Sequence, residues 1–297
     1  MIQCLYLGRV GYDEGLCLQA EMAGLVAEGR AQNVLLLLEH PPVLTLGRNA
    51  KRENILASDE MLKRRGVTVH EINRGGDVTY HGPGQLVGYP IFDLRTLRTE
   101  SGGRMGPVDF VRGMEEALIR LCGEFGVRAG RICGLTGVWC GKAGNREQGT
   151  GNSGPARECL HDVADSGGAE RKIGAIGIHV ARGITSHGFA FNVTTDLRDF
   201  ELIVPCGIAD HAVTSLAREV EHPEELPALE ELARLAAREF GEVFGEQVLA
   251  VESLEALREQ AAAAQQLPAP LPAEDTPLRV PAEVERLGGG DERPIRA

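Results

Sequence analysis

The sequence predicts an α+β domain over residues 1–262, with strands gathered into a sheet and helices packed on one side of it. Short apolar or alternating runs indicate the strands, longer runs with a period near 3.6 indicate the helices, and Gly and Pro separate them. Residues 263–297 follow as a Pro-rich, acidic tail with too little apolar surface to fold. We therefore expect one domain and a disordered tail.

Seven segments have the pattern of strands. The run at 33–40 is apolar through its centre, which indicates a strand buried on both faces. Residues 67–74 alternate, as a half-buried strand does, and residues 172–183 and 185–197 form a hairpin around a tight turn. The expected strands are 2–8, 33–40, 43–47, 67–74, 85–94, 172–183 and 185–197.

Helical composition predicts three long helices, at residues 12–29, 107–125 and 224–263. Pro107 suits the first position of the second helix, because that position needs no backbone donor. Gly126 ends the same helix. Ser58 can cap a short additional helix that begins at Asp59.

Residues 143–170 differ from the rest of the domain. They are rich in Gly, Asn, Ser and Asp and show no apolar periodicity. A loop of this length is uncommon inside a domain and is either functional or disordered. We interpret it as a disordered insertion.

The charge is concentrated at the C-terminal end. The chain carries 31 Lys and Arg against 43 Asp and Glu, a net charge of −12. Residues 219–297 hold 7 basic and 18 acidic side chains, which account for −11 of it. A basic footprint is typical of duplex nucleic-acid binders, so no nucleic-acid partner is expected. The longest strictly apolar run, residues 34–38, is too short to span a membrane, so no membrane association is expected either.

The seven Cys residues indicate neither disulfides nor a metal site. Their number is odd and no CxxC pair occurs, which argues against a disulfide framework and a zinc site. A reducing, cytoplasmic location is therefore expected. Cys4, Cys17, Cys122 and Cys133 are expected to be small buried hydrophobic residues, and Cys159 lies in the insertion.

Residues 74–85 read R-G-G-D-V-T-Y-H-G-P-G-Q and directly follow a predicted strand. The glycines allow a ligand to approach the backbone closely, and Arg74 and His81 add hydrogen-bond donors. Residues 81–88 lack the GxGxxG spacing, and the chain contains no GxxxxGK[ST] or GxSxG pattern. We interpret the run as the wall of a binding site that is not a nucleotide site.

Small residues recur in the predicted hairpin, as K-I-G-A-I-G at 172–177 and H-G-F-A-F-N-V at 187–193. They can leave a narrow slot for a linear apolar chain, or they can let a helix pack closely on the sheet. Taken alone, the pattern favours close packing. Further on, Pro205 and Gly207 hold Cys206 on a turn, where a nearby cation would make its thiol a nucleophile.

An ordered set of motifs is more specific than any one of them. They are H-P-P-V-L-T-L-G-R at 40–48, the run at 74–85, G-V-W-C-G-K at 137–142, K-I-G-A-I-G-I-H at 172–179, S-H-G-F-A-F-N-V at 186–193, D-L-R-D-F at 196–200 and P-C-G-I at 205–208. In this order the sequence resembles the lipoyl(octanoyl)transferases over about residues 1–218. The resemblance implies the fold of the biotin and lipoate protein ligases, a mixed sheet packed with helices.

The resemblance also implies an activity: transfer of an octanoyl group from octanoyl-acyl carrier protein to a lysine of a lipoyl domain. The implied acceptors are the lipoyl domains of 2-oxoacid dehydrogenases and the glycine cleavage H protein. Cys206 would be the nucleophile that carries the acyl thioester, and Lys172 would lower its pKa and act as general acid and base. The implied substrate-binding residues are Arg74, Gly75, Gly76, Asp77, Val78, Thr79, Tyr80, His81, Ala175, Ile176, Gly177, Gly188, Phe189 and Ala190.

No cofactor and no metal are implied, because the conversion of a thioester to an amide is downhill. Two features depart from the family: the insertion just before Lys172, where most relatives have a short turn, and the long tail. Two other functions remain open, an ATP-dependent lipoate or biotin protein ligase and a non-catalytic acyl-binding relative. The presence of both Cys206 and Lys172 argues against the second.

If residues 143–170 hold no part of the core, a short Gly-Ser turn in their place will leave the melting temperature nearly unchanged, because loop entropy grows slowly with length. Calorimetry on the full chain and the shortened chain measures this. A drop of more than a few degrees would mean that the insertion packs on the domain.

Overall fold

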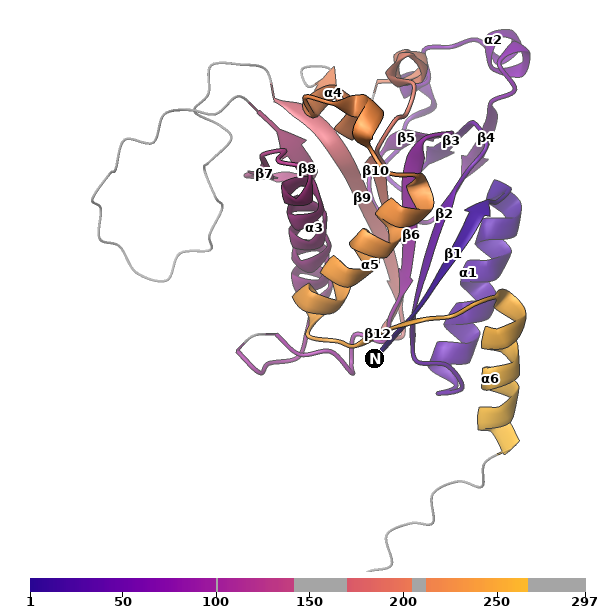
Figure 1. Cartoon of the computed structure of the whole chain (residues 1–297). Helices are drawn as coiled ribbons and strands as arrows, with labels where there is room; N and C mark the ends of the chain where they lie inside the picture. Colours follow the sequence, from indigo (N-terminus) through magenta and orange to yellow (C-terminus); the bar gives the residue numbers. More distant parts are fainter. Residues whose placement is uncertain (100, 142–169, 205–211, 267–297) are drawn as a thin grey trace, which may run out of the picture.

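The computed structural model describes residues 1–99, 101–141, 170–204 and 212–266 (Figure 1). A nine-stranded mixed sheet runs in the order β12-β1-β2-β6-β10-β9-β8-β7, with β11 beside β9. The pairs β12–β1, β1–β2 and β11–β9 are parallel, and the others are antiparallel. Its strands are β1 (Ile2–Arg9), β2 (Asn33–Glu39), β6 (Gln85–Ile91), β7 (Ala129–Ile132), β8 (Leu135–Cys140), β9 (Arg171–Ala181), β10 (Ile184–Asn192), β11 (Ala212–Val213) and β12 (Val248–Ala250).

A second sheet of three strands lies beside the first, in the order β4-β3-β5. Its strands are β3 (Val43–Leu46), β4 (Thr68–Glu71) and β5 (Val78–His81), and the short helix α2 (Asp59–Arg64) follows β3 in the chain. Leu44, Leu62, Tyr80 and Phe200 share a small core under this sheet. The Ser58 side chain accepts a hydrogen bond from the Met61 amide at 3.3 Å, so the predicted cap is confirmed.

Helices cover both faces of the large sheet, not one side as the sequence suggested (Figure 1). The residues of α3 (Pro107–Glu124) and α5 (Leu229–Phe244) pack on one face, and those of α1 (Tyr12–Ala27) and α6 (Leu254–Gln266) pack on the other. A short helix, α4 (Leu216–Glu219), precedes α5. The predicted start of α3 at Pro107 is confirmed.

The apolar run of β2 required this arrangement. Leu35 and Leu37 point into the core under α3 and α5, whereas Leu36 and Leu38 point into the core under α1. Successive strand side chains face opposite ways, so a strand without polar positions needs a covering layer on each face. The expectation of a doubly buried strand was therefore right, and it already contradicted the expectation of helices on one side.

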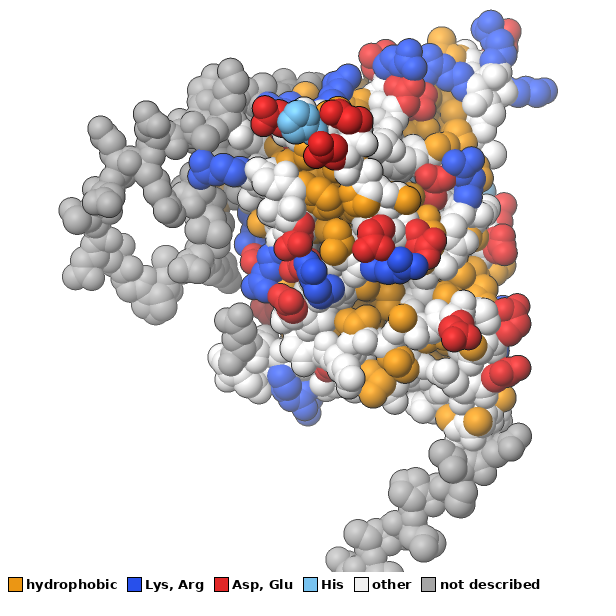
Figure 2. All heavy atoms as spheres, in the orientation of Figure 1, with side chains coloured by type: hydrophobic (Ala, Val, Ile, Leu, Met, Phe, Trp, Pro, Cys, Tyr) orange, Lys and Arg blue, Asp and Glu red, His pale blue; other side chains and the backbone are white. Residues whose placement is uncertain are grey.

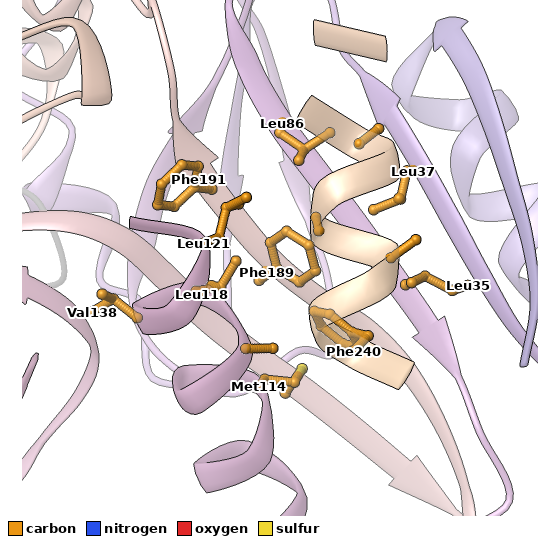
Figure 3. Close-up of a cluster of buried hydrophobic side chains, with 14 of the residues drawn as sticks. Leu35, Leu37, Leu86, Met114, Leu118, Leu121, Val138, Phe189, Phe191 and Phe240 are labelled. Atoms are coloured by element: carbon orange, nitrogen blue, oxygen red, sulfur yellow. The ribbon is translucent and has the colours of Figure 1, made fainter. Parts of the chain in front are cut away.

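The larger core joins α3, α5 and the sheet (Figure 3). The Phe189 and Phe240 rings stack with centroids 5.4 Å apart. Gly88 on β6 leaves the space for the Phe189 ring, because a Cβ atom at position 88 would clash with it. Phe189 therefore belongs to this core through its side chain.

The predicted helix at 224–263 is wrong in its middle. The chain forms α5, then β12, then α6, because Gly245 adopts a left-handed φ of 63° and ends α5. α6 extends to Gln266, past the boundary expected at residue 262. Strands β5, β7, β8, β11 and β12 were also not expected. Each is short or flanked by glycine, and therefore lacks a periodic pattern long enough to recognise.

The face that carries α5 is interleaved in charge (Figure 2). Arg234 contacts Glu230 and Glu231, and Arg238 contacts Glu124 at 2.9 Å. Glu230, Glu231 and Glu242 thus lie on a solvated helical face, as expected. Glu239 is instead buried and accepts a hydrogen bond from Arg238 at 2.8 Å. Within the described ranges, no helix combines the length and the apolar composition that a membrane span requires.

Gly88→Ala should lower the free energy of unfolding by about 1–3 kcal/mol, the usual cost of overpacking, because the Phe189 ring is held between β6 and Phe240. Gly24→Ala is the matched control. Position 24 is an exposed helix position with open space around it, so there the substitution should raise stability by about 0.5–1 kcal/mol. Urea unfolding of both variants measures the difference, and equal effects would contradict the packing argument.

Candidate functional site

A cavity of about 180 Å³ lies between the two sheets, on the face of the large sheet that α1 covers. Its floor follows from the strand register. Ala190 on β10 pairs with Ala175 on β9 and with Val87 on β6, and these three form one row across the floor. Gly188 pairs with Gly177 two positions further along. The floor therefore consists of small side chains, which leaves an elongated space above the sheet.

The opposite wall comes from the 74–77 loop and β5. The Gly75 amide donates a hydrogen bond to the Ile178 carbonyl of β9 at 3.0 Å, so the loop is attached directly to the large sheet. A Cβ atom at Gly177 would lie 2.7 Å from the Gly75 carbonyl oxygen. The glycine at 177 is thus required for the loop to approach the floor this closely.

Arg74 is buried and holds the wall together. Its guanidinium donates to the Thr45 carbonyl at 2.8 Å, to the Thr45 hydroxyl at 2.9 Å and to the Gly75 carbonyl at 3.0 Å. These bonds join the loop to β3. The motif arginine therefore acts within the protein, where it positions the loop that lines the cavity.

Three histidines near the cavity are held neutral. Burial is the main cause, and it lowers the pKa of His81 to about 3 and the pKa of His40 and of His187 to about 4. His81 contacts Gln85 Oε1 through Nδ1 at 2.8 Å. His187 adopts a left-handed φ of 58°, its amide donates to Gln19 Oε1 at 2.7 Å, and its Nε2 contacts Asn73 Oδ1 at 2.7 Å.

Lys172 stands at one end of the cavity. Its Nζ lies 4.5 Å from the centroid of the Trp139 ring, a cation–π contact with a side chain that is almost fully buried. Gly137 on the neighbouring β8 packs against β9, since a Cβ atom there would lie only 2.6 Å from the Gly174 carbonyl oxygen. The Lys172 carbonyl accepts a hydrogen bond from the Thr214 amide at 2.9 Å, just after β11. This bond places the described chain that follows β11 near the lysine.

The structure brings most of the predicted site residues to this cavity. Lys172 and all of the predicted substrate-binding residues except Tyr80 line it. Tyr80 points to the other side of β5, where its hydroxyl donates to Asp199 at 2.7 Å, because neighbouring strand residues face opposite ways. Phe189 also lines the cavity, although its ring points to the other face of the sheet and packs against Phe240 of α5. Cys206, Cys159, the insertion at 143–170 except its last residue, and the tail from 267 lie outside the described residues.

Sequence reasoning missed seven lining residues. They come from the start of α1, from β6, from the turn before β8 and the first residues of β8, and from β10: Tyr12, Val87, Tyr89, Gly134, Leu135, Thr136 and His187. The apolar alternation at 85–94 could have indicated Val87 and Tyr89, since both face the same side of a strand. Nothing local indicates Tyr12, because its place depends on how α1 packs.

The cysteine expectations need correction. Cys122 is buried, but Cys4 is only partly buried, and Cys17 and Cys133 are exposed. Burial raises the pKa of Cys4 and of Cys140 to about 12 and raises that of Cys122 well above its ordinary value, so none of these three is a ready nucleophile. Cys133 was misjudged because it lies in the tight turn between β7 and β8, whose neighbour Gly134 lines the cavity. In the described ranges no group of three or more His, Cys, Asp or Glu is arranged to hold a metal ion.

Comparison with known proteins shows which family the chain matches. The family described as "Lipoyl protein ligase A/B catalytic domain" matches residues 12–241. A protein named octanoyltransferase from Acidobacterium capsulatum is 56% identical over 255 residues, which cover 85% of this chain and 94% of that protein. An octanoyltransferase from Koribacter versatilis is 47% identical over 291 residues, 98% of each chain.

Solved structures share the fold at much lower identity. A bi-partite lipoate protein ligase from Thermoplasma acidophilum aligns with a TM-score of 0.59 and 17% identity, over 90% of this chain and 93% of that one. A lipoate-protein ligase A bound with ATP aligns with a TM-score of 0.58 and 16% identity, over 90% and 95%. The mixed sheet packed with helices, which the resemblance implied, is confirmed.

The neutral histidines predict how stability depends on pH. Their pKa values are lowered in the folded state, whereas in the unfolded chain each titrates near 6.5. The unfolded state therefore binds more protons below about pH 6.5, so stability should fall as the pH drops from 7 towards 5. Asn suits position 187 because it tolerates a positive φ. In His187→Asn the slope of the unfolding free energy against pH should be smaller, by the equivalent of up to one bound proton. Urea unfolding at several pH values measures the slope, and an equal slope would contradict a neutral His187.

Proposed function

We propose that this chain, which belongs to the octanoyltransferases of the lipoyl protein ligase A/B catalytic family, moves an octanoyl group from octanoyl-acyl carrier protein to a lysine of a lipoyl domain. The observation that carries the proposal is the cavity itself. It is narrow, its floor includes Ala175, Gly177, Gly188 and Ala190, and Lys172 stands at its end. This combination suits a linear apolar chain with a reactive carbonyl at one end.

The proposed reaction has two steps and uses Cys206 as nucleophile. In the first, the Cys206 thiolate attacks the carbonyl carbon of the octanoyl thioester, and the thiolate of the carrier's prosthetic group leaves and takes up a proton. In the second, the acceptor lysine amine attacks the Cys206 thioester, loses a proton and forms the amide, and the Cys206 thiolate is regenerated. No bond to a nucleotide is formed at any point.

Lys172 would serve both steps. As an ammonium it stabilises the Cys206 thiolate and donates the proton that the leaving thiolate takes up. The amine that results then accepts the proton from the incoming lysine. The cycle closes because the proton gained in the second step replaces the one lost in the first. The Trp139 ring, with its centroid 4.5 Å from Nζ, keeps the lysine head at the end of the cavity.

Donor recognition would use the exposed turn that supports the cavity wall. The Arg48 amide donates to the Arg74 carbonyl at 3.0 Å, and the Asn49 amide donates to the Gly76 carbonyl at 3.1 Å. Arg48 and Lys51 are exposed on this turn. Acyl carrier proteins are acidic, so a basic turn joined to the wall would steer the donor to the cavity entrance. The acceptors would be lipoyl domains of 2-oxoacid dehydrogenases and the glycine cleavage H protein.

Intact-protein mass spectrometry after incubation with octanoyl carrier protein tests the chemistry. The expected adduct is one octanoyl group, lost on addition of a lipoyl domain. Cys206→Ala should abolish the adduct. Cys133→Ala is the matched control, because Cys133 is the exposed thiol next to the cavity lining, and this variant should keep the adduct. Activity only with free octanoate and ATP would instead support a ligase.

Substitutions of Lys172 should separate its two roles. Lys172→Ala removes the cation, so acylation at pH 7 should slow by about 10²–10⁴-fold, the usual contribution of a general acid or base. Its rate should climb as the pH approaches the ordinary thiol pKa of about 8.5. Lys172→Arg restores a cation that does not give up its proton, so it should acylate faster than Lys172→Ala and still fail in the transfer to lysine. Single-turnover rates against pH measure both steps. A wild-type pH profile for Lys172→Ala would show that another group activates Cys206.

A further inference from the structure

The cavity is closed at the end opposite Lys172. Gln85 and Asn192 pair near the lysine end, Val87 and Ala190 pair two residues further on, and Tyr89 lies beyond them beside Gly188. The cavity therefore runs along the strands, from Lys172 past Ala175 and Ala190 towards Tyr89. Over Gly177 it is covered by Gly75, which leaves no passage between the loop and the floor.

Three aromatic rings form this closed end, and we call Tyr12, His40 and Tyr89 the aromatic wall. The Tyr12 and His40 ring centroids are 5.0 Å apart, and those of His40 and Tyr89 are 5.9 Å apart. Tyr12 and Tyr89 line the cavity, and His40 stands behind them, completely buried. The wall is thus built from large, rigid groups of two separate elements, α1 and β6, and from the chain after β2.

Hydrogen bonds fix the aromatic wall. His40 Nδ1 lies 2.7 Å from the Val10 carbonyl oxygen, which can only accept, so Nδ1 carries the proton. In the neutral ring Nε2 is then an acceptor, and the Tyr89 hydroxyl, 2.6 Å away, donates to it. The polar hydrogen of Tyr89 thereby points away from the cavity.

α1 prevents the wall from moving back. A Cβ atom at Gly15 of α1 would lie 3.0 Å from His40 Cε1 and 3.6 Å from Tyr89 Cε2. The helix backbone therefore packs directly against the rings, and no free space remains behind them. A ligand that is too long for the cavity cannot push the wall aside without displacing α1.

We propose that the aromatic wall sets the upper limit on the length of the acyl chain, with Tyr12 and Tyr89 as the specificity-determining residues. The inference rests on the proposed function, which places the acyl carbonyl at the Lys172 end. Four residues of strand separate the Gln85–Asn192 pair from Tyr89, a distance of about 13 Å. An extended alkyl chain is a zigzag in which each C–C bond of about 1.5 Å advances the chain by about 1.25 Å, so the seven bonds of an octanoyl group span roughly 9 Å. An eight-carbon chain fits, whereas a twelve-carbon chain of roughly 14 Å would meet the rings.

The test compares acylation rates with carrier protein loaded with eight- and twelve-carbon chains, measured by intact-protein mass spectrometry. The wild-type protein should strongly favour eight carbons. Tyr89→Leu and Tyr12→Leu each remove a ring from the wall, and each should raise the rate ratio of twelve to eight carbons by at least about tenfold, the usual selectivity of an apolar pocket for a small change in chain length. Tyr89→Phe keeps the ring and should keep the wild-type ratio.

Tyr80→Leu is the matched control, since it removes a buried ring from β5 on the side away from the cavity, and its ratio should equal that of the wild type. Circular dichroism establishes that each variant is folded, and Tyr12→Leu carries the test if Tyr89→Leu is not. An unchanged ratio in folded Tyr12→Leu or Tyr89→Leu would overturn the proposal. Failure of the wild-type protein to take up any octanoyl group would instead overturn the proposed function, so the two failures are distinguishable.

Discussion

The contact between the 74–77 loop and β9 is the constraint on which the site depends. A backbone hydrogen bond, from the Gly75 amide to the Ile178 carbonyl, joins the small sheet to the large one at this point, next to the side-chain contact between Asn73 and His187. It can form only because Gly177 has no side chain. With a larger residue there, the loop would stand further from the floor and the cavity would open at its closed end. The glycines of the motif and of the hairpin, which are far apart in the chain, therefore serve one contact.

The same contact explains why the Arg74 guanidinium is buried. Backbone bonds hold the loop to the turn at 47–49 as well as to β9, but none of these bonds reaches β3 itself. The Arg74 guanidinium supplies that link, because its hydrogen bonds reach both β3 and the loop. A buried guanidinium is costly unless its donors are satisfied, and carbonyl and hydroxyl oxygens satisfy them here. Without Arg74 the loop would lose its link to β3.

Residue patterns alone predicted the regular parts of the fold well. The doubly apolar β2, the Pro107 start of α3 and the β9–β10 hairpin follow from local periodicity and turn residues. The motifs also predicted those parts of the site that lie on glycine-rich segments. It was not predictable for Tyr12, which reaches the cavity only because α1 packs across β6 and β10, nor for the exposed Cys133, whose place depends on the turn between two short strands. Tyr80 shows the reverse error: it stands within the motif, and strand alternation turns it away from the cavity.

A chain of hydrogen bonds ties the cavity to the segment around Lys172 and determines the state of His81. The Thr214 carbonyl can only accept, so Asn192 donates to it through Nδ2 and accepts from Gln85 Nε2 through Oδ1. Gln85 Oε1 is then the acceptor that faces His81, and the neutral His81 carries its proton on Nδ1. Its Nε2 lone pair is left facing the Thr45 hydroxyl, 3.5 Å away. Since Thr214 also donates to the Lys172 carbonyl, the strand that carries the lysine and the ring that lines the cavity are held in register by one buried network. The fixed role of the Thr214 carbonyl therefore determines which amide atom of Asn192 faces it, which amide atom of Gln85 faces Asn192, and which nitrogen of His81 carries the proton.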